Sequence, residues 1–170
     1  DLSAYVKKLQ NEDQKMMLPL ALGTFEHYAQ HGAKCGASAD GRRAGETISS
    51  NYSPSVGCDT NGPTAAILSC TKPDLMPYFG GCPLDMQINS NEVAGDEGIK
   101  RLVGLIRSFM ELGGIILTIT GVSEEMLRDA QKNPEQHRGL RVRIGGYSGY
   151  FIALPPAHQE IMINRVKHGI

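Results

Sequence analysis

The clearest hydrophobic pattern in the chain runs over residues 96–112. Its apolar positions fall three and four residues apart, and Gly113-Gly114 interrupts the pattern. This spacing predicts an amphipathic helix that begins with Asp96 as its N-cap and buries one wide apolar face. The apolar positions of that face are Ile99, Leu102, Val103, Leu105, Ile106, Phe109, Met110 and Leu112.

Shorter patterns predict the other elements. Ser123 is a suitable N-cap for a helix that Asn133-Pro134 ends, and Pro155-Pro156 is suited to opening the final helix. The β-branched run at 115–120 predicts a buried strand. We expect further helices over 1–17, with Asp1 or Ser3 as N-cap, and over 64–69, and further strands over 20–28, 84–89 and 140–144.

Residues 32–63 lack periodicity and are rich in turn residues. A structureless stretch of this length is either disordered or functional, and its aliphatic and cysteine content argues against disorder. The expected order of elements defines an α/β chain with too few strands to close a barrel alone. We therefore expect one domain over 1–170, comprising a helix and strand (1–31), a loop-rich part (32–95), and helices, strands and a glycine-rich loop (96–170).

The composition argues against two classes of binding partner. The 170 residues are 41% hydrophobic and 21% charged, with a net charge of −1 and no cluster of Lys and Arg. Nucleic acid and anionic membrane are therefore not expected as partners. Every apolar run in the sequence, Ile115-Ile116-Leu117 included, is too short to span a bilayer, and no signal-peptide pattern is present, so we expect a cytoplasmic location.

Cysteine and histidine spacing gives no metal site. No two cysteines form a Cys-x-x-Cys pair, and the one His-x-x-x-His spacing, His27 to His31, lacks the glutamate of a His-Glu-x-x-His zinc motif. We expect no bound metal and reduced, mostly buried thiols. The cysteines are Cys35, Cys58, Cys70 and Cys82, and the histidines are His27, His31, His137, His158 and His168.

The segment from Arg143 to Phe151 combines three glycines with two tyrosines and a phenylalanine. It fits neither a phosphate-binding loop nor a dinucleotide motif, and Ser148 misses the Gly-x-Ser-x-Gly nucleophile pattern by one position. On these residues alone, a tight turn and a functional loop both stay open. Four loop carboxylates are candidates for acid–base chemistry or for turn capping: Asp40, Glu46, Asp59 and Asp85.

The sequence Arg143-Ile144-Gly145-Gly146-Tyr147-Ser148, followed by Gly149-Tyr150-Phe151, resembles the C-terminal radical motif of glycyl radical enzymes. That motif is Arg-Val-x-Gly-Tyr-Ser-x-Tyr-Phe in their lyase and dehydratase branch. Three upstream blocks resemble the same family in the same order. They are Asp40-Gly41-Arg42-Arg43-Ala44-Gly45-Glu46, Ser53-Pro54 through Gly62-Pro63-Thr64-Ala65, and Leu127-Arg128-Asp129-Ala130-Gln131 with Pro134-Glu135 and Leu140.

The resemblance implies that Gly146 stores a radical, installed by a radical S-adenosylmethionine activating enzyme, with no permanently bound cofactor. A glycyl α-carbon can become planar and delocalise the unpaired electron over two amides because it has no Cβ. The loop would swing out to the activating enzyme and return to a dry interior. The residues implied to support it are Arg143, Gly145, Tyr147, Ser148, Tyr150 and Phe151. The implied fold is part of a ten-stranded α/β barrel, to which 32–95 contributes.

The sequence departs from the family in two respects. The Gly-Cys-Val-Glu type loop, whose cysteine becomes the thiyl radical, has no match; Gly57-Cys58-Asp59 and Gly81-Cys82-Pro83 are the nearest. A second departure is the strand Leu117-Thr118-Ile119-Thr120-Gly121, where the family has a Gln-Phe-Asn-Val type sequence. We therefore expect this chain to be a separate subunit or a processed fragment that completes a larger chain bearing that cysteine.

The expected activity is radical cleavage of a C–O, C–N or C–C bond in a small-molecule substrate. The first alternative is a rescue part that replaces the oxygen-cleaved C-terminus of a full-length enzyme. A fumarate-adding synthase and an arylacetate decarboxylase also stay open.

Overall fold

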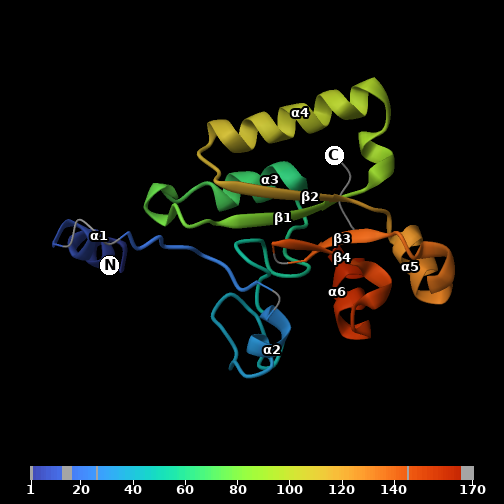
Figure 1. Cartoon of the computed structure of the whole chain (residues 1–170), viewed down its shortest axis with the longest axis horizontal. Helices are drawn as coiled ribbons and strands as arrows, with labels where there is room; N and C mark the ends of the chain where they lie inside the picture. The colour runs from blue at the N-terminus through green and yellow to red at the C-terminus, as the bar shows by residue number, and fades with distance from the viewer. Residues whose placement is uncertain (1, 13–16, 26, 145, 166–170) are drawn as a thin grey trace.

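The computed structural model describes residues 2–12, 17–25, 27–144 and 146–165. Within them, helices and strands alternate after a long irregular segment (Figure 1). The α-helices are α1 (Leu2–Glu12), α2 (Tyr28–Gly32), α3 (Gly62–Cys70), α4 (Gly95–Glu111), α5 (Glu124–Lys132) and α6 (Pro156–Arg165). The strands are β1 (Pro83–Ile88), β2 (Ile116–Gly121), β3 (Arg141–Ile144) and β4 (Tyr147–Tyr150). Single-turn 3₁₀ helices are η1 (Met76–Tyr78), η2 (Ser90–Val93), η3 (Pro134–His137) and η4 (Phe151–Ala153).

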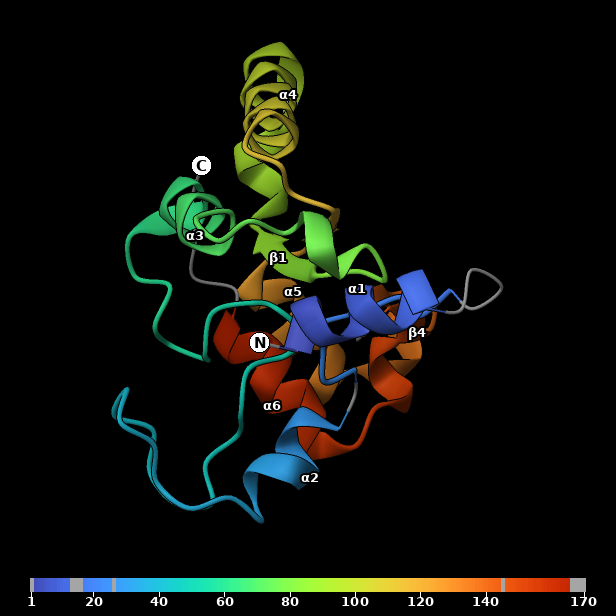
Figure 2. The same cartoon turned by 90° about the vertical axis from the view of Figure 1, so that its left-hand side faces the viewer.

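β1 and β2 form a parallel pair, and α4 is the crossover helix that joins them. The register runs from Pro83 opposite Ile116 to Ile88 opposite Gly121. α3 and α4 lie on the same side of this pair (Figures 1 and 2). Alternate β1 residues face these helices and form a buried cluster with them: Leu84, Met86, Ile88, Ile67, Leu105 and Phe109.

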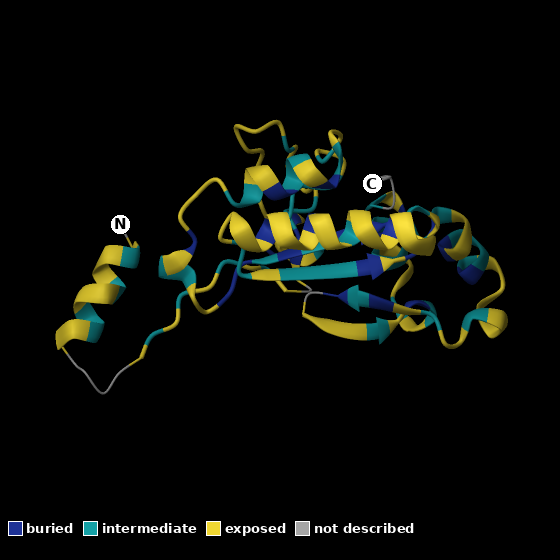
Figure 3. Ribbon diagram, turned by 90° about the horizontal axis from the view of Figure 1, so that it is seen from above, coloured by how far each residue is buried: buried dark blue, intermediate teal, exposed yellow. Residues whose placement is uncertain are grey.

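The predicted helix over 96–112 is confirmed, but two of its details are wrong. Ala94 occupies the N-cap position without a side-chain cap, and Asp96 lies in the first turn. The apolar face is wider than the surface that covers it: Leu105 and Phe109 are buried, whereas Ile99 and Met110 are 54% and 67% exposed. Figure 3 shows this outward side of α4 as exposed along its length. Only one stripe of the helix packs against the sheet, because a single pair of strands is too narrow to cover the whole apolar face.

β2 is not the buried strand that its composition predicts. Only Thr120 among its six residues is buried. The strand pairs with β1 on one side, and no other described strand pairs with it. The β-branched run therefore forms an exposed edge, which is a surface that proteins normally cover.

The other face of the β1–β2 pair is polar. Asp85 and Gln87 of β1 alternate with the residues that meet α3 and α4, so they point to the opposite side. Gln87 donates a hydrogen bond to the sulfur of Met162 in α6 (3.6 Å), and Thr120 accepts one from the backbone N–H of Arg143 in β3 (3.3 Å). The polar face therefore lies against the C-terminal part of the chain.

Residues 122–163 build a second core from sequence-local elements. α5, the β3–β4 hairpin and α6 close around it, as the lower right of Figure 1 shows. The buried members are Val122, Leu127, Ala130, Val142, Ile144, Phe151, Met162 and Ile163. The predictions of α5 with Ser123 as its N-cap, of β3, and of a last helix beginning at Pro156 are confirmed.

The strand predicted over 20–28 is wrong. Ala21 makes an isolated bridge to Gly81, and Tyr28 begins the short helix α2. Phe25 has φ +50, which turns the chain away from an extended path. α1 confirms the predicted N-terminal helix, although it contributes no buried residue and lies at one end of the molecule (Figure 3). Asp1, a suggested cap, lies outside the described residues.

The irregular segment 33–61 contains no helix or strand, as expected, and hydrogen bonds hold it in place. Asn51 is buried with φ +52; its amide donates to Asp85 (2.6 Å) and accepts from the N–H of Phe25 (2.9 Å). This one side chain ties the loop both to β1 and to the segment before α2. The segment is thus built into the fold rather than appended to it.

Candidate functional site: the glycine hairpin

The glycine-rich loop is the tip of an antiparallel hairpin. β3 and β4 pair from Arg141 opposite Tyr150 to Ile144 opposite Tyr147. This register leaves a two-residue loop, 145–146, of the length that gives the tightest hairpins. Gly145 lies outside the described residues. The hairpin was not expected from the sequence, because Tyr147 to Tyr150 contains too much glycine and serine for a strand pattern.

Gly146 has φ +111, a backbone conformation that L-residues with a side chain rarely adopt. A Cβ built at this position meets no atom within 4 Å, so glycine is required here by conformation and not by crowding. Gly146 is exposed in this chain. Its α-carbon is therefore accessible at the end of a two-stranded support.

Arg143 and Ser148 are cross-strand partners just below the tip. The Arg143 guanidinium lies 3.5 Å from the Ser148 hydroxyl, and the Arg143 backbone N–H donates to Thr120. The second bond connects β3 to the edge of β2. Arg143 thus lies where the hairpin joins the sheet, and its side chain and backbone stabilise different parts of that junction.

The three aromatic residues of the motif divide into two groups. Phe151 is fully buried in the C-terminal core, and its N–H donates to the carbonyl of Leu140 (2.9 Å), which closes the base of the hairpin. Tyr147 and Tyr150 are 49% and 46% exposed. The Arg141 guanidinium lies over the Tyr150 ring (5.3 Å to its centroid). In this chain Phe151 anchors the hairpin, whereas the tyrosines present an aromatic surface; their expected role in sealing the loop stays a prediction.

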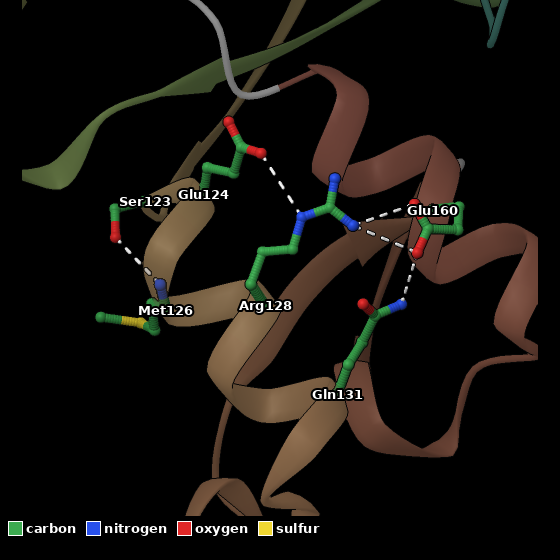
Figure 4. Close-up of polar contacts among 6 residues, drawn as sticks. All are labelled: Ser123, Glu124, Met126, Arg128, Gln131 and Glu160. Carbon is green, nitrogen blue, oxygen red and sulfur yellow. Dashed lines mark hydrogen bonds and ion pairs between the residues drawn. The ribbon is translucent and has the colours of Figure 1, made fainter.

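A polar contact drawn in Figure 4 joins α5 to α6, the two helices that share a core with the hairpin. The Arg128 guanidinium binds both carboxylate oxygens of Glu160, at 3.2 and 3.1 Å, and its Nε lies 3.4 Å from Glu124. Gln131 donates to the same Glu160 carboxylate at 3.0 Å. These hydrogen bonds, Gln131 first and Arg128 second, lower the pKa of Glu160. Arg128 and Gln131 belong to a block that resembled the family, and the structure gives them a fixed partner.

A second polar contact fixes the path from α5 into β3. His137 Nε2 lies 2.6 Å from Asp129 Oδ2, and Asn133 donates to Asp129 Oδ1 at 2.8 Å. The His137 hydrogen bond is the largest cause of the lowered pKa of Asp129. Gln159 of α6 donates to the carbonyls of Phe151 and Leu154, both at 3.1 Å, and so holds the turn that leaves the hairpin.

The candidate acid–base carboxylates lie in capping and structural positions where their contacts are known. Asp85 accepts from Thr118 (2.5 Å), Ser50 (3.2 Å) and Asn51, which fixes the loop to the sheet. Asp40 accepts from the Ser38 hydroxyl (2.6 Å), which lowers its pKa. Neither residue belongs to the hairpin. They were candidates for acid–base chemistry or turn capping because they lie in the loop-rich part of the sequence.

All four cysteines are free thiols, but the expectation that most are buried is wrong for two of them. Cys82 is buried and Cys70 is half-buried, and burial raises the pKa of both thiols. Cys35 and Cys58 are exposed, because the turns of 33–61 lie on the surface. Within the described ranges, no group of three or more His, Cys, Asp or Glu is arranged to hold a metal ion. No helix in the same ranges is long and apolar enough to cross a membrane.

Sequence reasoning missed several residues that position the hairpin: Gln87, Thr120, Gln159 and Glu160. Each makes its contact through one polar side chain on a strand or helix. The hydrophobic pattern of that element predicts its backbone conformation but not the partner of the polar side chain. No local signal distinguishes such a residue from a solvated one, because its partner is distant in sequence.

A parallel strand pair under two helices, with a glycine-tipped hairpin on its other face, is the class of fold and site that this chain presents. Comparison with known proteins identifies it. The glycine radical family model matches residues 48–152, which include the hairpin. Indoleacetate decarboxylase of Tractidigestivibacter scatoligenes is 38% identical over 142 residues, 83% of this chain and 16% of that protein. Trans-4-hydroxy-L-proline dehydratase of Clostridioides difficile is 36% identical over 132 residues, 78% of this chain and 17% of that protein.

Comparison with solved structures supports the same family. The glycerol-bound B12-independent glycerol dehydratase from Clostridium butyricum superimposes with a TM-score of 0.84 at 34% identity, over 89% of this chain and 19% of that one. The chain belongs to the glycine radical family, and corresponds to the C-terminal domain of glycyl radical enzymes. It spans about a sixth of the length of the curated relatives it matches. The resemblance inferred from the sequence is thereby confirmed.

Proposed function

We propose that this chain is the radical-storing domain of a glycyl radical enzyme that cleaves a C–O, C–N or C–C bond in a small molecule. The observation that carries the proposal is Gly146: an accessible α-carbon at a hairpin tip, in the segment that the family model matches. Loss of a hydrogen atom from this carbon leaves a planar radical delocalised over the adjacent amides. The hydrogen atom is removed by a radical S-adenosylmethionine activating enzyme, to which the exposed tip is presented.

The stored radical then passes to a cysteine in the rest of the enzyme. The cysteine thiol transfers its hydrogen atom to the Gly146 α-carbon, which leaves a thiyl radical to attack the substrate; the reverse transfer restores the glycyl radical after turnover. Each step moves one hydrogen atom, so no external oxidant is consumed. The rest of the enzyme, completing the ten-stranded barrel as a larger chain, covers Gly146 and the exposed Tyr147 and Tyr150 during this transfer.

Two reaction types are the leading candidates. The dehydratase relatives favour elimination of water from a small hydroxylated substrate, whereas the 38% identity to indoleacetate decarboxylase favours radical decarboxylation of an arylacetate. The activated enzyme, supplied with a polyol, with trans-4-hydroxy-L-proline and with indoleacetate in parallel, distinguishes them. Carbon dioxide release from indoleacetate alone would select decarboxylation.

Electron paramagnetic resonance tests the radical itself. After anaerobic activation we expect a doublet, split by the remaining α-hydrogen, that collapses to a singlet in D₂O. Gly146→Ala should give no such signal, and air should cleave the wild-type chain at Gly146. A doublet that persists in Gly146→Ala would refute the assignment.

A further inference from the structure

Two buried polar atoms, one on β1 and one on α6, have no hydrogen-bond partner within the described part of the chain. They are Oε1 of Gln87, on the polar face of β1, and Nη2 of Arg165, in the last described turn of α6. The Gln87 side chain is 8% exposed. Buried polar groups in folded proteins nearly always have a partner, so each of these atoms requires an explanation.

Both side chains line the same small cavity, which has a volume of about 20 Å³. Its other walls are carboxylates of Asp59 and Asp85 and the loop around Pro54. The cavity is large enough for one water molecule, which needs roughly 10–15 Å³ in the same measure and two or more polar partners. It is too small for a substrate or an organic anion.

The two orphan atoms are chemically complementary to one water. A guanidinium nitrogen only donates hydrogen bonds, and an amide oxygen only accepts them. The orientation of the Gln87 amide is set by its Nε2, which donates to the sulfur of Met162 at 3.6 Å and so directs Oε1 away from that sulfur. On its other side, the Arg165 guanidinium lies over the ring of buried Tyr28, 5.2 Å from its centroid.

We propose that one internal water molecule accepts a hydrogen bond from Arg165 Nη2 and donates one to Gln87 Oε1, bridging α6 to β1. This bridge makes Gln87 and Arg165 positioning residues for the glycine hairpin. α6 and the hairpin share one core through Phe151, Met162 and Ile163, so a contact that seats α6 on the sheet also seats the hairpin. The importance of the hairpin position for radical storage rests on the proposed function, but the water site does not.

The substitution that tests the bridge is Gln87→Met, made in the whole enzyme. Methionine keeps the length of the side chain but removes the Oε1 acceptor, together with the Nε2 donor to Met162, which Gln87→Glu also lacks. We expect amide hydrogen exchange in α6 and in the β3–β4 hairpin to quicken about tenfold, the effect of losing one buried bridge. Gln136→Met is the matched control, because Gln136 is exposed on η3 and the same change there should leave both segments unaltered.

Gln87→Glu separates a bridging role from mere packing. A carboxylate retains the acceptor, so exchange should return toward the wild-type rate. A crystal structure of the enzyme should show a water molecule within about 3.2 Å of both atoms. Direct contact between the two side chains, or unchanged exchange in Gln87→Met, would overturn the proposal. The paramagnetic signal of Gly146 is scored separately, so a missing radical would count against the proposed function alone.

Discussion

Arg128 and Glu160 join α5 to α6 through two hydrogen bonds from one guanidinium nitrogen, Nη1, to both carboxylate oxygens of Glu160. The two residues are 32 positions apart in the sequence, and their contact links α5 directly to α6 (Figure 4). Both side chains are partly exposed, at 40% and 48%. The pair therefore orients two helices whose attachment depends mainly on the core beneath them.

Salt should reveal how little stability this ion pair contributes. Arg128→Gln is expected to lower the melting temperature slightly at low ionic strength, and the difference from wild type should shrink in concentrated salt, which screens exposed charges. Thermal melts at two salt concentrations measure it. A large loss that persists in high salt would show that Arg128 contributes through packing instead.

Phe151 should dominate the stability of the C-terminal unit. Phe151→Ala removes a fully buried ring and is expected to cost about 3–5 kcal/mol in free energy of unfolding. Phe79→Ala is the control, because Phe79 is 52% exposed and its loss should cost far less. Denaturant unfolding of the two variants gives the comparison. Equal costs would contradict the core described here.

The backbone at Gly146 should resist substitution for reasons independent of the radical. Gly146→Ala places a side chain at φ +111 and is expected to cost about 1–3 kcal/mol through strain. Gly104→Ala in α4 also meets open space, but in a helical conformation, and should stabilise by up to about 1 kcal/mol. Unfolding measurements without activation separate strain from chemistry. A neutral Gly146→Ala would show that the tip relaxes.

The N-cap of α5 gives a further test. Ser123 accepts a hydrogen bond from the N–H of Met126 (3.2 Å), and Ser123→Ala is expected to cost about 0.5–2 kcal/mol. Ser108→Ala on the exposed side of α4 should be close to neutral. Unfolding midpoints in denaturant decide the matter, and a neutral Ser123→Ala would mean that another group satisfies the Met126 N–H.

Acid should weaken the contact between Asp129 and His137. The pKa of Asp129 is lowered below 3.8 in the folded chain, first by His137 and then by Asn133. Stability from this contact is therefore complete above pH 3.8 and is lost as the pH falls through the lower, folded pKa. Asp129→Asn should be less stable than wild type at neutral pH and converge with it in acid. Parallel melting curves at all pH values would contradict this.

The sequence determined the family and most of the local structure, and it supplied Gly146 as the position that we propose to be reactive. Gly146, its motif and the caps of α5 and α6 follow from neighbours in the chain, because turns, caps and periodicity are local properties. The order of helices and strands from 62 to 144 follows for the same reason, whereas β4 was not expected. Phe151 belongs to the same local motif, but its burial was not expected from the sequence alone.

Tertiary structure decided what each element meets. Whether the apolar residues of α4 and β2 are buried depends on how much surface lies opposite them. Ile99 and Ile116 stay exposed because the described part of the chain supplies only two parallel strands. The partners of Arg128, Asp129 and Gln87 are set by packing between elements distant in sequence. A polar side chain looks the same in a sequence whether it faces water or a buried acceptor, so only the fold distinguishes them.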